Sequence, residues 1–242
     1  MSTIPEKIHQ VRMQIDEACR TAGRPVGSVA LLAVSKTFGI DAIAEAVAAG
    51  QQAFGENYIQ EGVEKIGYFA EQPAYAGKGL VWHCIGPVQS NKTRLVAEHF
   101  DWMHTVDRLK IAQRLSDQRP ENLAPLQICI QVNVDGGATK SGVAPAEVEA
   151  LVRAVAELPR LVLRGVMSIP DAAADFDAQL AVHQRVKAVF DDIAKLGLPQ
   201  LQQWDTVSLG MTADLQAAVQ AGSTMVRVGS GIFGSRNYAT AG

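Results

Sequence analysis

Lys36 is the residue in this sequence with the clearest potential for covalent chemistry. It follows the apolar run Val29-Ala-Leu-Leu-Ala-Val34, with only Ser35 between them. An amine at the end of a buried strand is partly desolvated, which lowers its pKa and favours the neutral, nucleophilic form. Such a lysine can form a Schiff base with an aldehyde. The alternative is a lysine that extends from a strand end into solvent, and Lys36 taken alone fits that simpler interpretation.

A second group of residues, near the C-terminus, has the composition of a phosphate site. In Arg227-Val-Gly-Ser-Gly231, the glycines allow close approach to the backbone, and Ser230 adds a hydroxyl next to Gly229. Exposed N–H groups in such a turn can cradle a phosphate. Thr212 supplies another hydroxyl, in a loop that precedes a helical segment. The alternatives are a tight turn with Arg227 in a structural ion pair, and an ordinary helix N-cap at Thr212.

The elements that must position these residues alternate along the chain. Apolar runs predict strands that begin near Val29, Gln52, Leu80, Trp102, Leu126, Leu161, Trp204 and Thr224, each followed by a helical pattern. Eight such units in 242 residues match an α/β fold of the (β/α)8 TIM barrel type, which takes about 250 residues. A doubly wound open sheet also alternates, but eight units without a long break favour closure. We therefore expect one barrel domain over residues 1–242, with an extra N-terminal helix over 4–21.

Closure of the barrel would bring the candidate residues together. Lys36 follows the first predicted strand, Thr212 the seventh, and the turn from Arg227 to Gly231 the eighth. Function in these barrels is located at the carboxyl ends of the strands, and the loops after the seventh and eighth strands frequently bind phosphate. Together the three segments favour a Schiff-base lysine beside a phosphate site.

Composition excludes several other classes of protein. With 22 Lys+Arg against 25 Asp+Glu, the net charge of −3 disfavours bulk binding to nucleic acid or to an anionic membrane. Three cysteines without C-x-x-C spacing indicate no disulfide framework, and five histidines without paired spacing indicate no metal site. No secretory segment is recognisable at the N-terminus, so we expect a cytoplasmic protein.

Several motifs together resemble the YggS/PROSC family of pyridoxal phosphate homeostasis proteins. The resemblance runs in order from about residue 24 to residue 236. The motifs are Ala33-Val-Ser-Lys-Thr37, Phe54-Gly-Glu-Asn-Tyr58, Trp82-His-Cys-Ile-Gly86, Gln89-Ser-Asn-Lys92 and Ser223-Thr-Met-Val-Arg-Val-Gly-Ser-Gly-Ile-Phe-Gly234. The resemblance implies a barrel similar to the N-terminal domain of alanine racemase, which binds pyridoxal 5′-phosphate (PLP) as a reversible Schiff base on the lysine corresponding to Lys36.

The same resemblance implies roles for the other site residues. Thr212, Gly229 and Ser230 would hold the phosphate, and Arg227 would lie beside the cofactor, near its phosphate or its ring nitrogen. Asn57 and His83 would line the ring. The family is regarded as non-catalytic, so the implied function is intracellular PLP homeostasis, with PLP-dependent apoenzymes as recipients. We expect a monomer or a weak homodimer.

One loop departs from the family pattern. Members usually carry acidic residues before a Lys-x-Gly there, whereas this chain reads Asp135-Gly-Gly-Ala-Thr-Lys-Ser-Gly142. A role for an acidic group in this loop is therefore in doubt. Lys140 is either a second lysine for cofactor exchange or, as the simpler interpretation, a solvated loop residue.

Weak or absent catalysis is consistent with the residues available. Racemases with a similar barrel take a tyrosine base from an added β-domain, but the tyrosines here are few: Tyr58, Tyr68, Tyr75 and Tyr238. A permanently charged Arg227 at the ring nitrogen would also weaken the cofactor as an electron sink. The alternatives are a low-activity PLP-dependent amino-acid racemase of fold type III and a Schiff-base lyase acting on phosphosugars. The lyase would need a carboxylate beside its lysine, for which Glu56 is the candidate, although Glu56 fits equally well with a structural role capping the next helix.

Overall fold

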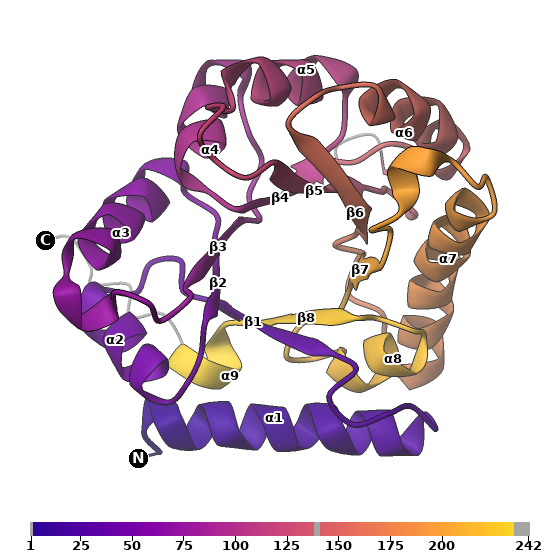
Figure 1. Ribbon diagram of the computed structural model, residues 1–242. Coiled ribbons are helices and arrows are strands. Elements are labelled where there is room, and N and C mark those ends of the chain that lie inside the picture. The colour runs from indigo at the N-terminus through magenta and orange to yellow at the C-terminus, as the bar shows by residue number, and fades with distance from the viewer. Residues whose placement is uncertain (1, 138–140, 235–242) are drawn as a thin grey trace, which may run out of the picture.

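Eight parallel strands form a closed barrel in the computed structural model, which describes residues 2–137 and 141–234 (Figure 1). Each strand pairs with the next along the chain, and β8 pairs with β1 to close the ring. The strands are β1 Ala30–Val34, β2 Ala53–Glu56, β3 Val81–Cys84, β4 Trp102–Val106, β5 Leu126–Gln131, β6 Leu161–Met167, β7 Thr206–Ser208 and β8 Met225–Val228. The predicted (β/α)8 barrel is confirmed, with each strand beginning within two residues of its expected position.

Helices surround the barrel on its outer face (Figure 1). They are α1 Ile4–Thr21, α2 Ile40–Ala48, α3 Ile59–Glu71, α4 Thr93–His99, α5 Leu109–Gln118, α6 Val148–Ala156, α7 Phe176–Ala194, α8 Leu215–Gln220 and α9 Ser230–Phe233. Short 3-10 turns lie at Pro73–Tyr75, Ser90–Lys92, Pro145–Glu147 and Pro199–Leu201. The helix after β7 is only six residues long, so it covers little of the barrel wall beside β8.

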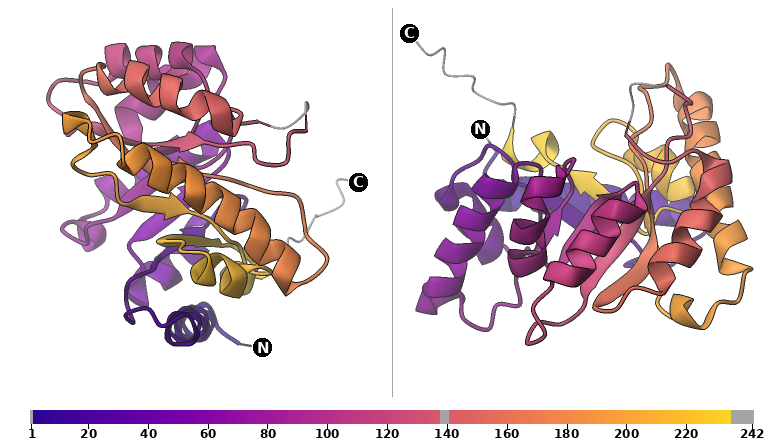
Figure 2. Two further views of the ribbon diagram at one scale, coloured as in Figure 1. Left: turned by 90° about the vertical axis from the view of Figure 1, so that its right-hand side faces the viewer. Right: turned by 90° about the horizontal axis from the view of Figure 1, so that it is seen from above.

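The extra N-terminal helix compensates for that short cover. α1 begins with a capping box, in which Thr3 and Glu6 each bond the other's backbone N–H. Its buried stripe of Ile8, Val11 and Ile15 packs on the side of the barrel formed by α8, α9 and α2. Figure 2 (left) views α1 nearly end-on and shows it outside the barrel ring. The predicted helix over 4–21 is therefore confirmed and forms part of the wall.

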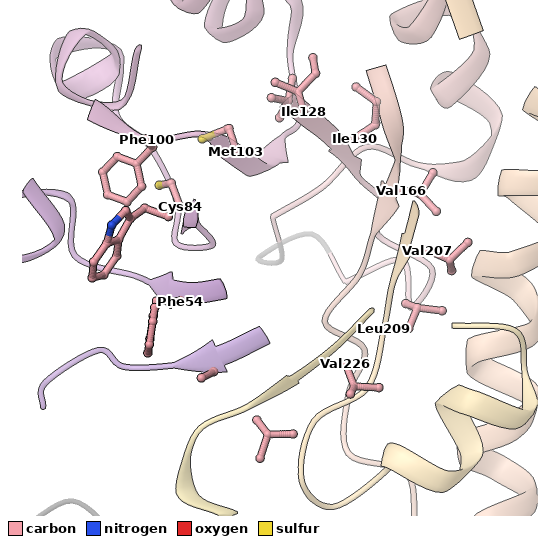
Figure 3. Close-up of a cluster of buried hydrophobic side chains, with 14 of the residues drawn as sticks. Phe54, Cys84, Phe100, Met103, Ile128, Ile130, Val166, Val207, Leu209 and Val226 are labelled. Carbon is pink, nitrogen blue, oxygen red and sulfur yellow. The ribbon is translucent and has the colours of Figure 1, made fainter. Parts of the chain in front are cut away.

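Alternation along the strands separates two apolar layers. Outward side chains, including Phe54, Ile128 and Val226, form the larger core between the barrel and its helices (Figure 3). Inward side chains of Leu32, Ile85 and Met225 form a small cluster inside the barrel. The interior also holds the buried polar side chains of His83, His104 and Arg227, and the candidate site lies at the carboxyl ends of the strands.

Within the described residues, no helix combines the length and apolar character needed to cross a bilayer. Nor does any group of three histidine, cysteine or acidic side chains in that part of the chain have the geometry of a metal site.

Candidate functional site

A cavity of about 650 Å³ occupies the carboxyl-terminal mouth of the barrel. Its wall brings together six of the seven residues that the sequence predicts for the site, which come from the segments after β1, β2 and β7, from β8 and from the turn that follows β8. The lining residues are Val34, Lys36, Phe38, Asn57, Ile85, Ile169, Met211, Thr212, Ala213, Arg227, Gly229, Ser230 and Gly234.

Lys36 reaches the cavity because of the alternation of β1. Leu32 and Val34 face the barrel interior, and Lys36 follows at the same spacing beyond the end of the strand. Its side chain is half-buried in the cavity wall. The lysine therefore lies at the mouth of the barrel, with the apolar side chains of Leu32 and Val34 directly beneath it.

Hydroxyl and backbone groups gather where the β7 and β8 loops meet, beside the β1 end that carries Lys36, because β8 pairs with β1. Thr212 and Ser230 both line the cavity. Gly231 permits this contact, because a Cβ there would lie 2.9 Å from Cγ1 of Val228 and 3.4 Å from Cγ2 of Thr212. Ser230 begins the single turn of α9, where the first backbone N–H groups have no partner within the helix.

Thr212 is not a helix cap. α8 begins at Leu215 and its N-cap residue is Asp214, so the alternative interpretation of Thr212 is wrong. Asp214 accepts a hydrogen bond from the N–H of Met211 at 2.6 Å and lies 2.9 Å from Nε2 of His183. These contacts anchor the loop on either side of Thr212 and hold its hydroxyl at the cavity.

Arg227 lies on the inner wall, and its guanidinium is held in place by hydrogen bonds. Nη1 donates to the carbonyl oxygen of Ser208 at 2.6 Å and to its Oγ at 2.8 Å, while Nη2 donates to the carbonyl oxygen of Ser168 at 2.9 Å. No carboxylate among the described residues pairs with it, so the expected alternative of a structural ion pair is not found. Burial lowers the pKa of Arg227 to about 10, which leaves it charged at neutral pH.

His83 does not line the cavity, which corrects the expectation that it contacts a ring there. It is buried inside the barrel, stacked on Trp102 with ring centroids 5.1 Å apart. Its Nδ1 lies 2.9 Å from Nε2 of His104. Ile85, two residues further along the chain after β3, does line the cavity. His83 therefore lies about 7 Å back along the strand, toward the barrel interior.

His104 and Ser208, to which no sequence motif assigns a role, connect this deeper layer to the site. Nδ1 of His104 lies 3.1 Å from Oγ of Ser208, the hydroxyl that also accepts from Arg227. Burial, and secondarily the charge of Arg164, lowers the pKa of His83 to about 3. Burial likewise holds the pKa of His104 well below its usual range, so both imidazoles are neutral at pH 7.

Asn57 contributes an unsatisfied acceptor to the wall. Its Oδ1 is buried and has no hydrogen-bond partner. The backbone beside it is tightly packed, because a Cβ at Gly86 would lie 2.2 Å from the carbonyl oxygen of Asn57. A buried amide oxygen without a partner is costly, and this one lies beneath the surface of the cavity that Asn57 lines.

Glu56 faces away from the cavity, toward α3. Its Oε1 accepts from Nζ of Lys65 at 2.8 Å and from Oγ of Ser35 at 2.6 Å. Burial raises the pKa of Glu56, and Lys65 opposes that shift. Glu56 therefore does not supply the carboxylate beside Lys36 that the lyase alternative would need, and no acidic side chain among the described residues lines the cavity.

The tyrosines offer no second acid or base to the cavity. Tyr58 is 54% exposed, and neither it nor Tyr68 or Tyr75 lines the site. Tyr238 and Lys140 lie outside the described residues.

Comparison with known proteins agrees with this geometry. Residues 8–237 match the family described as the N-terminal domain of alanine racemase. A pyridoxal phosphate homeostasis protein of Vibrio cholerae is 52% identical over 238 residues, which cover 98% of each chain. The chain belongs to the family of pyridoxal phosphate homeostasis proteins. This confirms the resemblance seen in the sequence motifs.

Solved structures related to this homeostasis family show the same barrel. PipY of Synechococcus elongatus with PLP bound is 34% identical, with a TM-score of 0.82 over 96% of this chain and 100% of PipY. Alanine racemase of Corynebacterium glutamicum aligns with a TM-score of 0.61 over 96% of this chain but only 62% of the racemase. At 18% identity, the racemase likeness shows the fold alone.

Proposed function

We propose that this protein binds PLP as a reversible Schiff base on Lys36 and serves intracellular PLP homeostasis without robust catalysis. The observation that carries the proposal is the single cavity wall that joins the Lys36 amine to the Thr212 and Ser230 hydroxyls and the Arg227 guanidinium. The PLP-bound structure of PipY, a close relative in fold and sequence, supports the same cofactor.

The residues present fit this cofactor in chemistry and in arrangement. The cofactor supplies an aldehyde, and Lys36 is the amine in the cavity wall. Thr212, Ser230 and the Gly229 backbone would bind the phosphate, since hydroxyl and N–H donors suit its oxygens. Oδ1 of Asn57 is an acceptor without a partner. Arg227 would lie beside the ring or the phosphate as a fixed cation.

A carrier role is supported by what the cavity wall contains. Apart from the amine of Lys36 and the guanidinium of Arg227, the described lining residues include no carboxyl, imidazole, thiol or phenol group. Efficient racemisation needs proton transfer on both faces of the substrate carbon, which Lys36 alone does not provide. Arg227 also stays charged in its hydrogen-bonded position, so it would not favour a protonated ring nitrogen.

The proposal extends to the protein as a whole. We propose that residues 1–242 form one domain. The protein would act in the cytoplasm as a monomer or weak homodimer and supply PLP to PLP-dependent apoenzymes. The name shared by its curated relatives supports the homeostasis role.

The proposal is tested by absorption spectroscopy of the purified protein with added PLP. A visible band that borohydride reduction removes, together with peptide mapping of the label to Lys36, supports the proposal. A protein that binds no PLP, or a label on another lysine, contradicts it. Racemisation of amino acids by the holoprotein at rates typical of enzymes, with turnover of 1 s⁻¹ or faster as an order of magnitude, would favour the racemase alternative.

A further inference from the structure

The two residues that flank Lys36 are held by one cluster outside the cavity, which is buried at Lys65 and partly exposed at Glu61. Nζ of Lys65 donates to the carbonyl oxygen of Ser35 at 2.9 Å. On the other side of Lys36, the N–H of Thr37 donates to Oε1 of Glu61 at 2.6 Å. Lys65 also donates to that same oxygen of Glu61 at 2.6 Å, so both neighbours of Lys36 are attached to adjoining turns of α3.

Thr37 adopts a backbone conformation that its side chain disfavours. Its φ is +67°, and Arg160 is the other non-glycine residue with positive φ in the part of the chain that the structure describes. A β-branched residue in the left-handed region is strained, so surrounding contacts must hold it there. The hydrogen bond from its N–H to the Glu61 carboxylate is such a contact, and it is charge-assisted.

Lys65 fixes Glu61 in the position that this contact needs. Its side chain is only 6% exposed and forms ion pairs with Glu61 at 2.6 Å and Glu56 at 2.8 Å. Glu56 in turn accepts from the hydroxyl of Ser35. The cluster therefore connects α3, the end of β2 and the loop after β1 in one hydrogen-bonded unit.

We propose that Glu61 and Lys65 are positioning residues for Lys36. They hold Thr37 in the left-handed conformation and anchor the carbonyl of Ser35, so the backbone on both sides of Lys36 is fixed and its side chain stays in the cavity wall, toward which the alternation of β1 directs it. This inference rests on the proposed Schiff base at Lys36, and it adds two residues of α3 that line no part of the cavity.

The test compares PLP binding in four proteins: the unmodified chain, Glu61→Ala, Thr37→Gly and the double variant. Binding is followed by the visible band, and reactivity by the rate at which borohydride labels Lys36 in the presence of PLP. The Glu61→Ala variant loses a charge-assisted hydrogen bond, so its affinity for PLP should be about tenfold weaker than that of the unmodified chain. Thr37→Gly alone should bind within about threefold of the unmodified chain, because glycine adopts positive φ readily.

The double variant separates positioning from a general effect on stability. If Glu61 acts by holding the strained Thr37 backbone, glycine at position 37 makes that support less necessary, and binding should recover at least about threefold. A glycine in an exposed loop offers no rescue for a helix that has merely lost stability. Recovery in the double variant supports the inference, whereas binding as weak as in Glu61→Ala overturns it.

Glu64→Ala is the matched control, because Glu64 is an exposed glutamate on the same helix. It should bind PLP as the unmodified chain does. If Glu61→Ala folds poorly by circular dichroism, Glu61→Gln replaces it, alone and with Thr37→Gly, since the amide keeps an acceptor but loses the charge. Unchanged binding and labelling in the Glu61 variants would contradict the inference while leaving the Schiff base intact. Absence of the band in the unmodified chain would instead contradict the proposed function.

Discussion

Nη1 of Arg227 donates hydrogen bonds to both the carbonyl oxygen and the hydroxyl of Ser208, at 2.6 and 2.8 Å. The guanidinium is thus fixed by the strand beside it, before any ligand arrives. Preorganisation of this kind lowers the entropy cost of binding an anion or an aromatic ring. Through the same hydroxyl, the arrangement continues to His104 and then to His83 in the barrel interior.

Substitution of Arg227 should weaken cofactor retention. Arg227→Gln removes the fixed charge from the cavity wall, and we expect PLP affinity to fall at least about tenfold, by analogy with the loss of a charged hydrogen-bond donor. Equilibrium dialysis with PLP measures the change. Arg153→Gln, at an exposed arginine paired with Glu149 on α6, is the control and should bind normally. Unchanged affinity in Arg227→Gln would remove Arg227 from the site.

Substitution of Lys36 should abolish the covalent link and leave the barrel folded. Lys36 extends from the end of a strand and contributes little to the core, so Lys36→Ala should change the free energy of unfolding by less than about 1 kcal/mol. Absorption spectra with PLP, before and after borohydride reduction, give the first readout, and urea denaturation gives the second. Lys78→Ala, in an exposed loop at the other end of the barrel, should retain the band. A wild-type spectrum in Lys36→Ala would show that another lysine carries the cofactor.

Much of the fold, and the positions of several site residues, can be predicted from local patterns in the sequence. Eight apolar runs, each with a helix after it, specify the barrel because parallel strands need crossover connections. The order of strands in a closed barrel then places Arg227 on β8 between Thr212 after β7 and Lys36 after β1, although Lys36 lies far from the other two in the sequence. Lys36, Thr212 and the Gly229 turn therefore need no information beyond chain order.

The sequence does not predict which face of a strand a site residue occupies, or how deep in the barrel its side chain lies. Glu56 alternates with Gly55 and so faces α3, but the sequence does not show which face of a four-residue strand is the inner one. His83 is on the inner face, yet it lies one layer too deep, and only the stagger of neighbouring strands determines that depth. The contact between Thr37 and Glu61 depends on how α3 packs on the barrel, so no local pattern reveals it.

The buried imidazoles predict how stability depends on pH. The pKa of His83 is about 3 in the folded protein, against about 6.5 in the unfolded chain. Between these values the unfolded chain binds a proton that the native protein does not, so stability rises with pH across the window from about 3 to 6.5. Each such histidine contributes up to about 1.4 kcal/mol per pH unit.

Urea denaturation at a series of pH values from about 4 to 7 measures this slope, because most of the window between the two pKa values of His83, about 3 to 6.5, lies in that range. His83→Asn keeps a polar atom near the position of Nδ1 but does not titrate, so its curve should be shallower than that of the unmodified chain. His9→Asn, at an exposed histidine on α1, is the control and should leave the slope unchanged. Parallel curves for the unmodified chain and His83→Asn would show that His83 titrates normally in the folded state.

Among the charged residues, substitution of Lys65 should lower the free energy of unfolding most. Its ammonium is buried and bonds Glu56, Glu61 and the carbonyl oxygen of Ser35, so Lys65→Met leaves the fully buried Glu56 without its cation. Breaking a buried ion pair from one side costs about 3–5 kcal/mol, and chemical denaturation should show a loss of that size. Lys187→Met, at a half-buried lysine paired with Asp191 on α7, should cost under about 1 kcal/mol.

A second substitution identifies the cause of that loss. In Lys65→Met/Glu56→Gln the buried carboxylate is gone, and we expect roughly half of the lost stability to return. Because the native pKa of Glu56 is raised by burial, the single variant should also lose more stability as pH rises above about 4.5, where the unfolded carboxyl is already ionised. A loss in Lys65→Met that is independent of pH and unaffected by Glu56→Gln would mean that Lys65 stabilises the barrel by packing alone, through its buried methylene chain.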